Sequence, residues 1–322
     1  MTARPAPRRL ALTLGALAAA LALTACDLRL ETEPPAEPTP RHAEQVRERA
    51  VDDALALAAA ARSAQSLADE ATAAVLADVA RFSSSQAERL GGAYDSGLPR
   101  PTDTATATPV GATPDQVLAA LRLDAAAALA DATANDDGAM ARLLVAVGVA
   151  RDELATRLAA ALNEPAAAPA PTDAAPAPTP AASGGLPADE VAPLVLAHDQ
   201  AGFGLEVVAA RLSGDQRTAA ATAAAAHRAT AEQWARRSGI AATGDDPRRA
   251  VYALPADVGD PQGARALAAG LETAVANAAS AAIVRAPADA RAELIDEVTA
   301  ATGAAAGWGA APVAFPGIAE LG

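Results

Sequence analysis

The chain has 322 residues, a net charge of −14, a single cysteine and no lysine. An acidic surface repels phosphate backbones and anionic headgroups, so nucleic acid is excluded as a partner and the folded part is not expected to bind lipid directly. Alanine, the best helix former, is the commonest residue and aromatic residues make up only 2% of the chain, so we expect an all-α protein.

The first 26 residues predict a lipoprotein signal. Three arginines precede an apolar run over residues 10–23, which is too short to span a bilayer comfortably. The run ends in Leu23-Thr24-Ala25-Cys26, which resembles the lipobox of bacterial lipoproteins, where the thiol is alkylated with diacylglycerol before cleavage. We expect residues 1–25 to be removed and Cys26 to be lipidated on the extracytoplasmic face of the cell membrane. The alternative is an ordinary secretory signal with a chance cysteine.

Proline-rich segments divide the remaining sequence. Residues 26–41 contain four prolines and predict an extended tether, and residues 164–187 are rich in proline, alanine and threonine and predict an interdomain linker. We therefore expect an N-terminal helical bundle over 42–163 and a C-terminal one over 188–322.

Helix caps and breakers predict four helices in each part. Ser66 is expected to cap the second helix, Gly91-Gly92 to end it, and Asp215 to cap the sixth helix. Thr113-Pro114 and Asp260-Pro261 each place a cap before a proline at the first helical position. The expected helices cover about 42–62, 67–90, 114–133, 137–162, 188–212, 215–238, 261–286 and 287–307.

The two parts repeat one plan, which is a hairpin, a connector of about twenty residues and a second hairpin. The spacing from cap to glycine stop is nearly the same from Ser66 to Gly91 as from Asp215 to Gly239, which indicates a duplication. The alternative is that alanine-rich helices align with anything. A long middle connector is what a four-helix bundle of ferritin-like topology needs, because its second and third helices run parallel. We expect two such bundles in tandem.

Five motifs in the second part carry a resemblance to a known family. They are His198-Asp199 through Phe203, His227-Arg228, Tyr252-Ala253-Leu254-Pro255, Leu271-Glu272 and Phe315-Pro316-Gly317. With these motifs, residues 194–318 resemble the ferritin-like domain of unknown function 4439 of actinobacterial envelope lipoproteins. The first part lacks the motifs, and the sequence departs from the family pattern at one point, since His198 precedes Asp199 where the pattern has the acid first. The resemblance implies a fold and an envelope setting, and no established activity.

Few residues could form a site in this second part. A di-iron centre of ferritin-like type takes two Glu-x-x-His pairs, and none occurs in the chain, so we expect no metal and no cofactor. His198, Glu206, His227 and Glu272 remain as a candidate polar core or ligand site. Glu272 continues an apolar face, so it is expected to point inward, either paired with His227 or an arginine beside it, or as a ligand.

Other chemistry has weaker support. Glu293, Asp296 and Glu297 share one side of the last helix, where we expect a solvated acidic face, with a metal cluster as the alternative. Nothing predicts catalytic residues, since there is no free thiol, no Gly-x-Ser-x-Gly and no phosphate-binding loop. We expect a non-catalytic module that is held to the membrane by its lipid and binds an envelope protein or small ligand. The alternative is a metal- or ligand-dependent redox enzyme using a degenerate site in the C-terminal bundle.

The lipid anchor is directly testable. Cys26→Ser should release the protein from membranes or leave it as unprocessed precursor, because each buried methylene of an acyl chain contributes about 0.8 kcal/mol and the acidic chain itself gains little from lipid. Mass spectrometry of the native N-terminus checks this, and an unmodified mature chain that starts elsewhere would contradict it.

Overall fold

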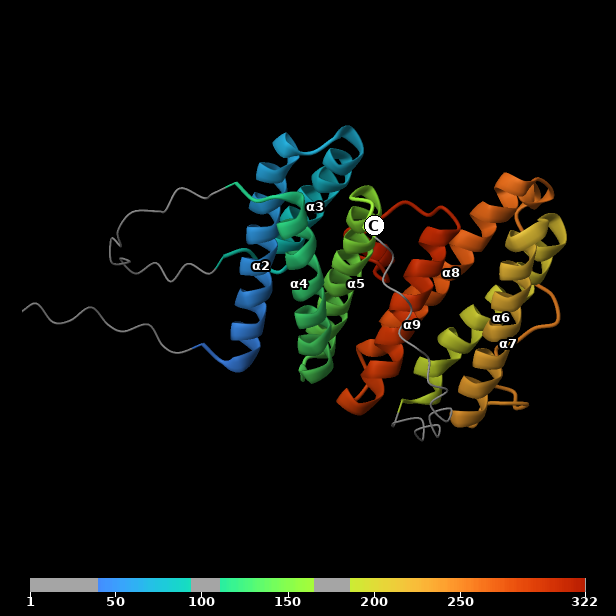
Figure 1. Cartoon of the computed structure of the whole chain (residues 1–322). Helices are drawn as coiled ribbons and strands as arrows, with labels where there is room; N and C mark the ends of the chain where they lie inside the picture. Colours follow the sequence, from blue (N-terminus) through green and yellow to red (C-terminus); the bar gives the residue numbers. More distant parts are fainter. Residues whose placement is uncertain (1–39, 94–110, 165–185, 322) are drawn as a thin grey trace, which may run out of the picture. The chain divides into compact units, whose positions relative to one another are not determined.

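The computed structural model describes residues 40–93, 111–164 and 186–321, and these are all-α as expected, without a strand (Figure 1). Residues 41–322 form one compact unit. The predicted signal, the predicted lipidation site Cys26, nearly all of the tether, the connector over 94–110 and most of the linker lie outside the described residues. The helices are α2 (His42–Ala64), α3 (Glu70–Arg89), α4 (Pro114–Ala134), α5 (Gly138–Ala161), α6 (Ala188–Arg211), α7 (Gly214–Arg237), α8 (Pro261–Ile283) and α9 (Ala288–Gly307).

Local capping chemistry explains most helix boundaries. Thr113 and Gln116 form a reciprocal capping box at the start of α4, and Asp260 accepts hydrogen bonds from two backbone N–H groups at the start of α8. Gly91 has a φ of 99°, as the predicted left-handed exit from α3 requires.

Two predicted caps are wrong. Asp69 caps α3 in place of Ser66, because its carboxylate accepts the Thr72 N–H at 2.8 Å, while the Ser66 hydroxyl donates to the Ser63 carbonyl. Helix α7 begins at Gly214, before the predicted cap Asp215, and has no side-chain cap.

Each half of the described chain is built from two helical hairpins. In the first half α2 pairs with α3 and α4 with α5, and α2 also contacts α4 while α3 contacts α5. In the second half α6 contacts α7 and α8, α8 contacts α9, and side chains of α7 reach α9. Figure 1 shows α3 and α4 running in the same direction, and α7 and α8 likewise. This is the helix order that the long connectors predict.

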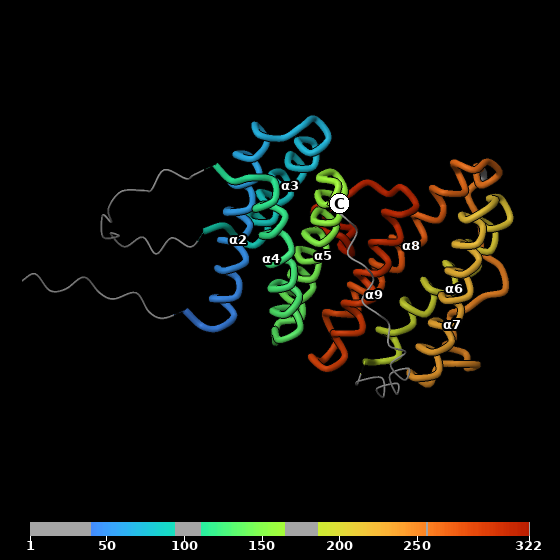
Figure 2. Tube along the Cα trace, viewed as in Figure 1, coloured from blue at the N-terminus to red at the C-terminus, as the bar shows by residue number. Residues whose placement is uncertain are grey.

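The two halves share a hydrophobic core, which the sequence did not predict. Helices α4 and α5 pack against α8 and α9 (Figure 2). The backbones approach closely at Gly138, where a Cβ atom would lie 2.0 Å from the Val284 carbonyl oxygen. The shared core includes Val46, Leu144, Val145 and Val149 from the first half, and Leu194, Trp234, Ile283 and Leu294 from the second.

Helix α8 is the one helix in the described ranges that is long and apolar enough to cross a membrane. In this fold one face of the helix belongs to the core. Val275, Ala279 and Ile283 are buried between the neighbouring helices.

The segment after α9 ties the two halves together. Phe315 and Ile318 are buried against Ala128 of α4 and Val147 of α5. The guanidinium of Arg142 donates to the Gly317 carbonyl at 3.2 Å and to the Glu320 carboxylate at 2.7 Å, and the Gln86 amide donates to the Ala314 carbonyl at 3.1 Å. The segment is therefore held by side chains of the first half.

Arg291 offers a test of the contact between the halves. Its buried guanidinium on α9 donates to the Ala286 carbonyl and to the Ala132 and Asn135 carbonyls at the end of α4. Arg291→Met should lower the free energy of unfolding by about 2–3 kcal/mol, because carbonyls at a buried helix end lose a charged donor.

Arg285→Met is the matched control for Arg291→Met. It removes the same charge from a side chain that is 69% exposed and should change the free energy by less than about 1 kcal/mol. Denaturant unfolding followed by circular dichroism measures both. Equal effects would show that the guanidinium of Arg291 does not join the halves.

Candidate functional site

A chain of four polar side chains lies at the centre of the second half, with one residue from each helix. His198 of α6 and His227 of α7 face each other with their Nδ1 atoms 2.9 Å apart. The Nε2 of His227 lies 3.2 Å from Glu272 of α8, and the Nε2 of His198 lies 3.3 Å from Glu297 of α9. His198 and Glu272 are only 5% and 3% exposed, so the middle of the chain is shielded from water.

Three close contacts join these side chains in the order Glu272, His227, His198 and Glu297. In the contact between the two Nδ1 atoms one imidazole donates and the other accepts, so the two rings play different roles.

Trp234 closes the chain at the Glu297 end. Its Nε1–H donates to Oε1 of Glu297 at 2.7 Å, which leaves Oε2 for His198. The guanidinium of Arg237 lies 4.0 Å from the centre of the Trp234 ring and also pairs with Glu293. Trp234 thus links the buried chain to the ion pair of Arg237 and Glu293 at this end.

Glu206 does not belong to this group, although it was one of the predicted site residues. It lies at the surface, where its carboxylate pairs with Arg228 at 2.7 Å and its side chain is 53% exposed. The guanidinium of Arg228 holds the pKa of Glu206 below its ordinary value. The structure thus brings together His198, His227 and Glu272 and leaves Glu206 outside.

Asp199 anchors the connector between α7 and α8. It accepts hydrogen bonds from the Tyr252 hydroxyl at 2.6 Å and the Arg249 backbone N–H at 3.1 Å, and its other oxygen lies 3.3 Å from Arg228. The Tyr252 ring packs edge-on against Phe203. Burial, with the bond to Asp199, raises the pKa of Tyr252 to about 12. These residues of the family motifs therefore have a structural role.

The acidic face predicted on the last helix is only partly solvated. Asp296 is exposed, but Glu293 pairs with Arg237, and the Glu297 side chain turns inward and is 16% exposed. The prediction failed for Glu297 because this residue lies beside the buried Val298, at the edge of the apolar stripe. That position was the one signal in the sequence that could have identified it.

The four groups do not fit the di-iron centre that a ferritin-like fold implies. A di-iron centre takes a Glu from each of two helices and a Glu-x-x-His pair from each of the other two, whereas the four helices here supply one Glu or one His each, which is two carboxylates too few. Both carboxylate oxygens of Glu297 already lie within hydrogen-bonding distance of protein groups, which are His198 Nε2 and Trp234 Nε1. In the part of the chain that the structure describes, no three His, Cys, Asp or Glu side chains are arranged to hold a metal ion.

The first half has its own polar centre at Arg151 of α5. The buried guanidinium donates to the carbonyls of Asp124 at 3.3 Å and Ala50 at 3.4 Å. Burial lowers the pKa of Arg151 and raises the pKa values of Asp53 and Asp124, two acids that interact with it electrostatically. This centre contains no histidine.

Comparison with known proteins agrees with the resemblance seen in the sequence. Residues 193–320 match the model of the family described as Domain of unknown function (DUF4439). No curated protein and no solved structure gave a match. The family assignment of the second half is confirmed, and it carries no activity with it.

Glu272 and Glu206 give a matched pair of variants in this half. Glu272→Ala should lower the free energy of unfolding by about 3 kcal/mol, because it leaves the buried Nε2 of His227 without its carboxylate. Glu206→Ala removes an exposed ion pair and should cost less than about 1 kcal/mol. Urea unfolding followed by circular dichroism compares them, and a larger effect of Glu206→Ala would contradict the assignment of the buried chain.

Proposed function

We propose that the protein is a non-catalytic helical binding module, held at the extracytoplasmic face of the cell membrane by a lipid on Cys26. Its partner is an envelope protein or a small ligand. The two halves act as one rigid unit in this proposal, because they share a core and the segment after α9 joins them.

The observation that carries the proposal is the closed polar chain from Glu272 to Glu297. A catalytic or metal site needs a group that is free to meet a substrate, or an open coordination position. Here the polar atoms at the centre of the bundle face one another, and Trp234 takes the remaining oxygen of Glu297. Such a centre fixes the packing of four helices.

The sequence motifs support the same conclusion. The Tyr252 motif holds the connector on α6 through Asp199. The Phe315-Pro316-Gly317 motif brings the chain against α8, since Gly317 has a φ of 80° and its Cβ would lie 2.7 Å from that of Ser280. Both motifs thus build the fold. The envelope location rests on the lipobox at Cys26 and on the acidic charge, which leaves the acyl chains to hold the membrane.

Metal analysis tests this proposal against the redox alternative. The protein purified without chelators should contain much less than one equivalent of iron, manganese or zinc. Its melting temperature should not rise when ferrous, manganous or zinc ions are added, because a metal that binds only the native state would stabilise it. Elemental analysis and thermal unfolding provide the two measurements.

The outcome that overturns the proposal is specific. Stoichiometric metal that is lost in His227→Ala and kept in Glu206→Ala would place an ion in the buried chain, since Glu206 lies outside it. The redox alternative would then replace the binding module.

A further inference from the structure

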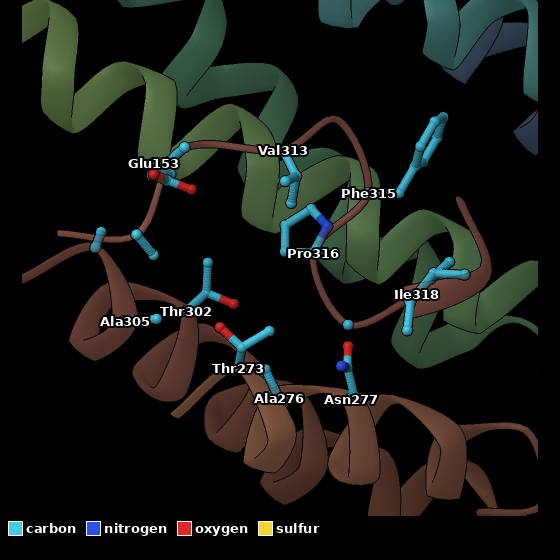
Figure 3. A pocket seen from close by; sticks show the side chains of 15 residues that line it. Glu153, Thr273, Ala276, Asn277, Thr302, Ala305, Val313, Phe315, Pro316 and Ile318 are labelled. Atoms are coloured by element: carbon cyan, nitrogen blue, oxygen red, sulfur yellow. The ribbon is translucent and has the colours of Figure 1, made fainter. Parts of the chain in front are cut away.

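A cavity of about 170 Å³ lies beneath the segment that joins the two halves. Figure 3 shows Thr273, Asn277 and Thr302 rising from α8 and α9 toward Pro316, with Glu153 of α5 toward the same end as Thr302 and Ile318 at the opposite end. The cavity is partly open to solvent and is separate from the histidine chain, none of whose members lines it.

Glu153 gives the cavity its charge. Burial raises the pKa of its carboxyl group, and Arg157 one turn further along α5 offsets this only in part. No ion pair to Glu153 is found in the ranges that the structure covers. A half-buried carboxylate whose desolvation is only partly offset by one arginine is stabilised by a ligand that brings a further cation into contact.

The other polar groups of the cavity can accept hydrogen bonds. The Thr302 hydroxyl is buried and has no partner among the described residues. Thr273 donates its proton to the Ala269 carbonyl at 2.8 Å, which leaves its oxygen as an acceptor. A buried hydroxyl without a partner is unfavourable, so a donor placed in the cavity would gain from it.

The remaining wall is apolar and sets the size of the ligand. Alanine side chains of α8 and α9 face Val313, Phe315, Pro316 and Ile318 of the crossing segment. An apolar cavity of about 150 Å³ holds one benzene molecule, so about six non-hydrogen atoms fit in this space. The net charge of −14 further favours cations over anions.

We propose that this cavity binds a small aliphatic ammonium ion, with its nitrogen at Glu153 and the Thr302 hydroxyl and its alkyl chain under Val313 and Pro316. This inference rests on the proposed function as a non-catalytic binding module. An ammonium group supplies a positive charge and only donates hydrogen bonds, which matches a half-buried carboxylate and an unpartnered hydroxyl.

Three probes of equal size separate charge from shape. Pentylamine, 1-pentanol and butanoate each have six non-hydrogen atoms, and their binding to the full mature chain is measured by calorimetry and by ligand-observed magnetic resonance. Pentylamine should bind saturably, pentanol about tenfold or more weakly than pentylamine, and butanoate not at all. Equal binding of pentanol and pentylamine, or no binding of pentylamine, would overturn the proposal.

Paired variants locate the site. Glu153→Gln should weaken pentylamine about tenfold or more, whereas Asp152→Asn, which makes the same charge change at an exposed neighbour, should leave its affinity unchanged. Thr302→Val should weaken it about threefold to tenfold, whereas Thr299→Val, one turn earlier on α9, removes a hydroxyl that donates to the Ile295 carbonyl and should not. Melting curves of all four variants show that each is folded.

The outcomes separate this inference from the proposed function. Equal weakening in Asp152→Asn and Glu153→Gln would show a general charge effect and reject the cavity. Metal in the histidine chain would reject the non-catalytic module and leave pentylamine binding as an independent result. Absence of both metal and pentylamine binding would reject the ammonium site alone.

Discussion

Alanine-rich helices carry little apolar surface per residue, and this constraint shapes the whole molecule. Burial stabilises a fold roughly in proportion to apolar area, so a bundle with few leucine and valine side chains gains little from its own core. The two halves combine theirs, with Leu144 and Val145 in the same cluster as Ile283 and Leu294. Small residues also let the backbones approach closely, as Gly138 does at Val284. The scarcity of large side chains is thus offset by a shared core.

A thin core also makes buried polar groups decisive. Both halves have such groups at the centre and compensate them internally, the first with Arg151 and the second with the chain from Glu272 to Glu297. Asp124 and Glu272 lie one residue apart in their distance from the caps of α4 and α8. The chemistry around the two acids differs, because Arg151 occupies the first centre and two histidines the second.

Helix existence and most boundaries could be predicted from the sequence, because caps, prolines and glycines act locally. The start of α3 was misplaced, because the Asp69 carboxylate, and not the predicted Ser66 hydroxyl, accepts the Thr72 N–H. The site was harder. Glu272 could be predicted from the apolar face of its own helix, with His227 as its partner. Glu297 could not, because it turns inward to contact Trp234 and His198, which lie on other helices. The contact between the halves could not be predicted, because alanine occurs on every face of these helices and no separate apolar stripe in the sequence marks the interface.

The small side chains that let the two halves pack closely also leave the cavity under the segment after α9 unfilled. Helices α8 and α9 present alanines and threonines beneath the crossing segment, and these side chains are too short to fill the space under Pro316. The segment cannot collapse onto them, because Gly317 already touches Ser280 and Arg142 holds its carbonyl. The Phe315-Pro316-Gly317 segment therefore fixes one wall of the cavity, and the small side chains of α8 and α9 form the opposite wall. In such a fold a binding site arises where the core lacks large side chains. Glu153 and Thr302 then determine which class of ligand the proposed site binds.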